Sequence, residues 1–132
     1  MSQDRDQIIA RIDAFYEAIS GPSGHEHDWQ SLAALFVSGA SILSSRREGV
    51  QGARTVDAYV DRLRESLTNR DFFERGFEYR IEAHGDIAQV WSRYEASSAP
   101  DFAEIQRTGT NLIHFIREDG VWKIAGMVYQ DD

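Results

Sequence analysis

The residue best suited by type and position to move a proton is His114. It lies between Ile113 and Phe115 in the segment RTGTNLIHFIRED, whose alternation of polar and apolar residues predicts a strand. An imidazole titrates near neutral pH, so a histidine that faces a cavity can serve as a general acid or base. The alternative is a neutral histidine of the core, hydrogen-bonded to a tyrosine or serine.

The tyrosines supply a second group of candidates. Tyr16 and Tyr59 fall in expected helices, and Tyr79, Tyr94 and Tyr129 fall in expected strands. A phenol can donate a hydrogen bond to a carbonyl or enolate oxygen, or it can simply add apolar area to the core. We assign Tyr94 and Tyr16 to catalysis beside the histidine, as hydrogen-bond donors. The residues expected to bind a ligand are Tyr59, Tyr79, Ser92, Thr110, Leu112, Met127, Tyr129 and Ser44.

Other catalytic motifs are absent from the sequence. Without cysteine, the chain has no disulfide, no thiolate metal site and no thiol nucleophile. Its glycines are scattered and form no phosphate-binding loop. His25 and His27 flank Glu26 in a polar loop, with too few neighbouring ligands for a metal site. No pair of carboxylates stands out, and we expect neither a cofactor nor a metal.

The overall charge limits the choice of partners. The 132 residues contain 14 Lys and Arg against 22 Asp and Glu, a net charge of -8. Such a surface repels a phosphate backbone, so we expect no nucleic-acid partner. The N-terminal MSQDRDQ does not resemble a secretory signal, and no apolar run is long enough to span a bilayer. We expect a cytoplasmic protein with one domain over residues 1–132.

Hydrophobic periodicity divides the chain into two halves. Apolar residues recur at helical spacing over residues 3–20, in a short segment capped by Asp28, and in a third segment capped by Thr55. A short strand is expected at residues 40–46. Beyond Asn69 the period changes from helical to two, which predicts a series of strands. The chain is therefore expected to fold as an α+β protein.

Two tight turns set the expected strand register. Counting from Gly85-Asp86 places Glu78 opposite Arg93, with Phe77 opposite Tyr94. The same count brings Arg80 beside Trp91 and pairs Tyr79 with Ser92.

Counting from Asp119-Gly120 places Phe115 opposite Ile124, and Ile113 opposite Gly126. For the hairpin between these two, opposite charges favour pairing Glu95 with Arg107.

This register predicts which side chains share a face of the sheet. His114, Tyr94 and Met127 would face the helices and line a pocket. Trp91, Phe115 and Trp122 would lie on the outer face, where such an apolar patch is unusual for a monomer. We therefore expect a homodimer through that outer face.

The order of these segments resembles a known superfamily. IIARIDAFYEAI, DWQSLAALFVSGASIL, DIAQVWSRYEA and RTGTNLIHFIREDGVWKIAGMVYQ follow one another as in nuclear transport factor 2-like proteins, in their polyketide-cyclase-like and ketosteroid-isomerase-like branches. The resemblance covers nearly the whole chain. It implies a cone-shaped, curved antiparallel sheet wrapped around three N-terminal helices, with a pocket inside.

The superfamily includes ketosteroid isomerases, scytalone dehydratase and polyketide cyclases, so the resemblance leaves the reaction open. The isomerase pattern would place aspartates near Ser44 and near Leu112 or Ile113, where this chain has none. Tyr16 falls near the tyrosine of that pattern, and His114 lies in a strand comparable to one that carries histidine in the dehydratase. The resemblance implies a pocket for a small hydrophobic ligand and lyase or isomerase chemistry. The alternative is a non-catalytic ligand-binding or dimerisation module.

Overall fold

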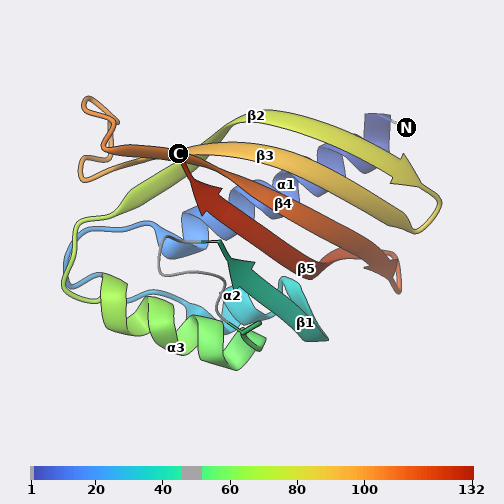
Figure 1. Cartoon of the computed structure of the whole chain (residues 1–132), viewed down its shortest axis with the longest axis horizontal. Coiled ribbons are helices and arrows are strands. Elements are labelled where there is room, and N and C mark those ends of the chain that lie inside the picture. The colour runs from blue at the N-terminus through green and yellow to red at the C-terminus, as the bar shows by residue number, and fades with distance from the viewer. Residues whose placement is uncertain (1, 46–51) are drawn as a thin grey trace.

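A curved five-stranded sheet wraps around the first helix (Figure 1). The computed structural model describes residues 2–45 and 52–132. Its elements, in chain order, are α1 (Ser2–Ile19), α2 (Trp29–Ala33), β1 (Phe36–Ser44), α3 (Val56–Leu67), β2 (Phe73–His84), β3 (Ile87–Ser97), β4 (Arg107–Glu118) and β5 (Val121–Asp131). The predicted α+β class is confirmed. The expected strand at 40–46 begins earlier, at Phe36, and position 46 lies outside the described residues.

The caps predicted at Asp28 and Thr55 are confirmed. The Asp28 carboxylate accepts a hydrogen bond from the Ser31 amide at 3.0 Å, and the Thr55 hydroxyl accepts one from the Ala58 amide at 3.1 Å. Each satisfies an amide that the helix itself leaves without a partner. Helix α1 buries its apolar stripe against the concave face of the sheet, through Ile8, Ile12, Phe15, Tyr16 and Ile19. Among the described residues, no helix is long and apolar enough to cross a membrane.

The sheet has the strand order β1-β5-β4-β3-β2. Strands β2 to β5 are antiparallel neighbours, as predicted, but β1 pairs with β5 in parallel. Parallel pairing requires a long crossover connection, and here α3 and strands β2 to β4 separate the two strands along the chain. The sheet is thus mixed rather than purely antiparallel.

The first hairpin follows the predicted register only as far as Glu78. Glu78 lies opposite Arg93, and the Arg80 guanidinium stacks on Trp91 at 4.7 Å, both as predicted. Beyond that point a β-bulge at Phe77 inserts one extra residue, so Gly76 rather than Phe77 lies opposite Tyr94. One extra residue reverses the face of every side chain that follows, because side chains alternate along a strand.

The predicted pairing of Glu95 with Arg107 is wrong by one residue. Glu95 lies opposite Thr108, and Ala96 lies opposite Arg107. Charge pairing therefore does not set this register. Where β3 and β4 join the loop between them, the Gln106 amide donates a hydrogen bond to the Ala96 carbonyl at 2.9 Å.

The last hairpin follows its predicted register only near the turn. Phe115 does lie opposite Ile124, but a second bulge at Ala125 places Met127, not Gly126, opposite Ile113.

These shifts exchange the faces that were predicted for β4 and for the start of β5, whereas Ser92, Tyr94 and Met127 are buried and Trp91 is exposed, as predicted. Phe115 and Trp122 are buried at 2% and 1% exposure inside the sheet, not on its outer face. His114, Leu112 and Thr110 lie on the outer face instead. The reason is the strand period of two, since a slip of one residue inverts every side chain of the strand.

Candidate functional site

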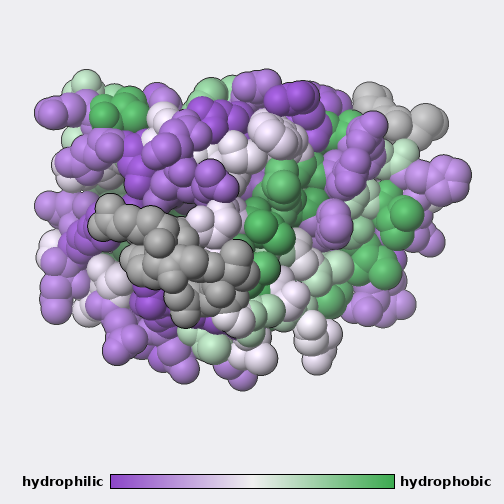
Figure 2. Space-filling model, viewed as in Figure 1, coloured by the Kyte–Doolittle hydropathy of each residue, from purple (hydrophilic) through white to green (hydrophobic). Residues whose placement is uncertain are grey.

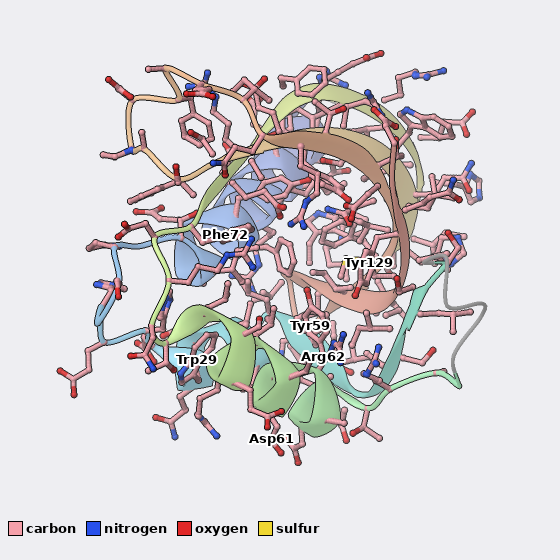
Figure 3. All side chains as sticks on the ribbon, turned by 60° about the vertical axis from the view of Figure 1, so that its left-hand side comes forward. Trp29, Tyr59, Asp61, Arg62, Phe72 and Tyr129 are labelled. Atoms are coloured by element: carbon pink, nitrogen blue, oxygen red, sulfur yellow. The ribbon has the colours of Figure 1, made fainter. Side chains whose placement is uncertain are left out.

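A cavity of about 230 Å³ lies between α1, α3 and the inner face of the sheet. Part of its wall is apolar and part is charged. The apolar wall consists of Phe15, Ile19, Leu63, Leu67 and Phe72. The polar wall comes mainly from the sheet. Figure 3 shows Tyr59 and Arg62 on the side of α3 that faces the sheet, with Phe72 and Tyr129 across from them and Asp61 pointing outward.

Glu74 is the most unusual polar residue of this cavity. The bulge at Phe77 turns the Glu74 side chain inward, where only 8% of it is exposed. Burial raises its pKa from 4.5 to about 8, partly opposed by Arg107 and reinforced by Asp131. Its carboxyl group is therefore mostly protonated at neutral pH and is able to give up a proton.

Arg107 lies between two carboxyl groups of the cavity wall. Its guanidinium is 4.0 Å from the Glu74 carboxyl (Nη2 to Oε1) and 3.5 Å from the Asp131 carboxylate (Nε to Oδ1). Asp131 also accepts a hydrogen bond from the Tyr94 hydroxyl at 2.5 Å. The site therefore combines a protonated acid, a second carboxylate and a fixed positive charge on one wall.

Three buried side chains form a hydrogen-bonded network next to this wall. The Tyr16 hydroxyl is 2.7 Å from the Ser92 hydroxyl and accepts a hydrogen bond from Asn111 Nδ2 at 3.0 Å. Asn111 lines the cavity. Burial raises the pKa of Tyr16, so its phenol stays neutral. Tyr16 therefore fixes the orientation of the amide that the cavity presents.

The structure gathers only some of the predicted site residues. Tyr94, Tyr59 and Tyr129 line the cavity, and Tyr16 and Ser92 lie behind it in the network. Met127 and Ser44 are buried in the core, with no hydrogen-bond partner for the Ser44 hydroxyl within the described chain. Tyr79 instead donates a hydrogen bond to Asp13 at 2.6 Å. Thr110, Leu112 and His114 lie on the opposite face, so His114 cannot act in this cavity.

Several polar residues of the cavity were not predicted from the sequence, among them Glu74, Arg107 and Asp131. A signal for the first was present, because an isolated glycine inside a strand often marks a bulge and Gly76 precedes the bulged residue.

The histidines of the polar loop lie next to each other. Within the described ranges, no three His, Asp or Glu side chains converge as metal ligands. His25 and His27 make an edge-to-face ring contact instead, with centroids 4.7 Å apart.

Comparison with known proteins agrees with this fold. Residues 2–128 match the SnoaL-like domain family, and the chain belongs to that family. None of the curated proteins compared with the chain matches it.

Several solved structures share the fold. A protein of unknown function with a cystatin-like fold from Nostoc punctiforme superimposes with a TM-score of 0.81 at 13% identity, over 100% of this chain and 93% of the other. A nuclear transport factor 2-like protein of unknown function from Silicibacter pomeroyi gives 0.73 at 18% identity, over 99% and 98%. A protein from Novosphingobium aromaticivorans, provisionally named a scytalone dehydratase, gives 0.75 at 18% identity, over 98% and 84%. At these identities the similarity establishes the fold alone.

Proposed function

We propose that the protein is an enzyme of the lyase or isomerase type that uses Glu74 to move a proton on a small organic compound. The observation that carries this proposal is the buried Glu74 carboxyl, with a pKa of about 8, on the wall of a cavity. A carboxylic acid held neutral near physiological pH is the form that a general acid requires. Membership of a family that includes isomerases and cyclases supports the same class of reaction.

In this proposal each polar residue of the cavity wall has a separate role. Glu74 gives a proton to an oxygen of the substrate, either a carbonyl oxygen or a departing hydroxyl group. Asp131, oriented by the Tyr94 hydroxyl, accepts a proton from carbon. Arg107, 4.0 Å from Glu74, stabilises the carboxylate that remains after Glu74 has given up its proton. The apolar wall excludes water and holds the body of the substrate.

A deuterium-exchange assay tests the proposal with a panel of simple carbonyl compounds. Small ketones and β-hydroxy carbonyl compounds are incubated with the protein in D2O, and NMR follows deuterium uptake beside the carbonyl and loss of water. We expect uptake or dehydration with at least one compound, and a loss of about a hundredfold in Glu74→Gln. Glu78→Gln, on the outer face of the same strand, is the matched control. Equal rates in the wild type and Glu74→Gln would rule out the proposed role of Glu74.

The second candidate is a non-catalytic ligand-binding module. The feature that favours it is the Tyr16–Ser92–Asn111 network, whose polar atoms are engaged in mutual hydrogen bonds at the edge of the cavity. Saturable binding of a compound that the protein leaves chemically unchanged, with no exchange in D2O for the whole panel, would support this candidate instead.

We also propose that the outer face of the sheet pairs with a second copy of the chain. Strand pairing places Trp91, Leu112 and Val128 in one row across β3, β4 and β5, each about 40% exposed. Hydrophobic side chains gather over the middle of β4 and β5 in Figure 2, with hydrophilic ones around them. The rows of the outer face on either side of the apolar row carry charges of both signs, such as Arg93 on one side and Glu82 on the other. An apolar centre with a mixed polar rim is the composition of a self-pairing interface.

A further inference from the structure

The cavity carries positive charge in an acidic protein. The chain has a net charge of -8, yet three arginines line this one cavity: Arg62, Arg70 and Arg107. The acidic residues on its described wall are Glu74 and Asp131. Glu74 is mostly protonated at neutral pH, so it adds little negative charge to the described wall. The described wall therefore carries more positive than negative side chains, in contrast to the molecule as a whole.

Two of the three arginines are available to a ligand. Arg107 is engaged by Asp131 at 3.5 Å and by Glu74 at 4.0 Å. Within the described part of the chain, neither Arg62 nor Arg70 forms an ion pair or a side-chain hydrogen bond.

Arg64 lies on the same helix as Arg62 but differs from it in having an acidic partner. It forms an ion pair with Asp61 at 3.2 Å on the outward side of the helix. The Arg70 guanidinium is positioned over the Phe72 ring, 5.4 Å from its centroid, at the cavity wall. An arginine that lines a cavity without an acidic partner offers a planar set of donors to an external anion.

We infer that this cavity binds a small organic carboxylate, whose carboxylate group is held by Arg62 and Arg70 and whose apolar body lies between Phe15 and Phe72. This inference rests on the proposed function, because it names the class of compound on which Glu74 would act. Arginine presents two parallel N–H groups to a carboxylate, which gives directional as well as electrostatic selection.

The size of the cavity fits a ligand with one ring. An apolar cavity of about 150 Å³ holds benzene. The present cavity, at about 230 Å³, has room for a ring and a carboxylate group but not for a large polycyclic compound. Its apolar wall supplies the contact area for the ring. Its two uncommitted arginines supply the contact for the charge.

The protonation of Glu74 makes anion binding dependent on pH. Below a pH of about 8 the Glu74 carboxyl is neutral and does not repel an anion. As the pH rises through 8, Glu74 acquires a negative charge in the same cavity. Anion binding should weaken over that range, and Glu74→Gln should abolish the weakening while it keeps binding at pH 7.

The experiment compares acids with neutral compounds of the same shape. Benzoate and benzamide, and cinnamate and cinnamamide, are titrated into 15N-labelled protein at pH 7, and amide shifts of the cavity residues report dissociation constants. We expect each acid to bind at least tenfold more tightly than its amide. Binding of the acid should weaken three- to tenfold in Arg62→Gln and in Arg70→Gln, but not in the control Arg64→Gln. Raising the salt from 0.1 to 0.5 M, a roughly twofold change in the screening length, should weaken only the acids.

Several outcomes would overturn the inference. They are equal binding of acid and amide, failure of all four probes to shift the cavity signals, unchanged acid binding in both cavity variants, and clearly tighter binding of phenyl phosphate than of benzoate. Equal thermal midpoints of the variants exclude loss of folding as the cause. Binding of benzoate without any Glu74-dependent exchange in D2O leaves the anion site standing and removes the proposed acid–base role. Glu74-dependent turnover of neutral compounds, without binding of the acids, would support the acid–base role and rule out the anion site.

Discussion

The hydroxyl of Tyr94 donates a hydrogen bond to Oδ1 of Asp131, 2.5 Å away, across an intervening strand. Tyr94 on β3 lies opposite Gly109 on β4, and Gly109 lies opposite Asp131 on β5. A Cβ on Gly109 would overlap the Tyr94 ring and hydroxyl and would come within 2.6 Å of the Gln130 carbonyl. The missing side chain therefore lets the phenol reach a carboxylate two strands away.

Replacing Gly109 with alanine should break this arrangement. The added methyl group overlaps the Tyr94 ring, so we expect a loss of about 2–3 kcal/mol in the free energy of unfolding, as in other overpacked sites. Urea denaturation measures the loss. Gly52→Ala, where a Cβ meets no atom within 4 Å, should change stability by less than about 0.5 kcal/mol. A Gly109→Ala variant as stable as the wild type would show that Tyr94 does not need this space.

Glu74→Gln should change how stability depends on pH. The folded protein holds the Glu74 proton up to a pH of about 8, whereas the unfolded chain loses it near 4.5. Between these values the folded state binds more protons, so the stability contributed by this group falls as the pH rises. It is complete below 4.5 and lost above 8.

Glutamine has no proton to lose, so the variant should lack this decline and be more stable than the wild type at pH 9, by roughly 2–5 kcal/mol. Urea denaturation at pH 5, 7 and 9 measures the difference. Glu78→Gln, whose side chain is about half exposed, is the control and should leave the slope unchanged. Parallel pH profiles for the wild type and Glu74→Gln would contradict a raised pKa.

Tyr16→Phe should destabilise the protein because it leaves the hydrogen-bond partners of the Tyr16 hydroxyl unsatisfied. Removal of the hydroxyl leaves the buried Ser92 hydroxyl and the Asn111 amide without their shared partner. An unsatisfied buried polar group costs about 1–3 kcal/mol, and we expect a loss in that range by thermal or urea unfolding. Tyr79→Phe removes a hydroxyl that bonds to Asp13 at a more exposed site, and should cost less than about 1 kcal/mol. Equal losses in the two variants would argue against a special role for the buried network.

Leu112→Glu should prevent self-association through the outer sheet face. Leu112 lies in the middle of the apolar row, directly between Trp91 and Val128. A charge placed there would be buried without a partner in the proposed dimer. Light scattering at micromolar concentration should show a dimer for the wild type and a monomer for the variant. Ile105→Glu, at a residue 40% exposed in the loop before β4, should remain dimeric. A monomeric wild-type protein would contradict the proposed dimer.

Local signals in the sequence were enough to predict the order of elements and two of the hairpin turns. Asp28 and Thr55 cap their helices as predicted. The Gly85-Asp86 turn correctly placed Glu78 opposite Arg93 and Arg80 on Trp91. Each of these features depends on residues that are near one another in the chain or joined by a two-residue turn, so tertiary packing has little freedom to change them.

The faces of the late strands were decided by tertiary structure. Both alternating sets of residues in β4 contain large apolar side chains, so periodicity alone could not tell Phe115 from His114 as the buried member. Which side chains face the core was decided by two bulges, at Phe77 and Ala125, and by the one-residue shift between β3 and β4.

The sequence by itself thus determined which segments are helices and strands, and hence the family to which the chain belongs. Only the folded sheet decided that Glu74 faces the cavity while His114 faces outward. The physical reason is that the side chains of a strand alternate with a period of two, so a single inserted or shifted residue exchanges the contents of the two faces without changing any local preference.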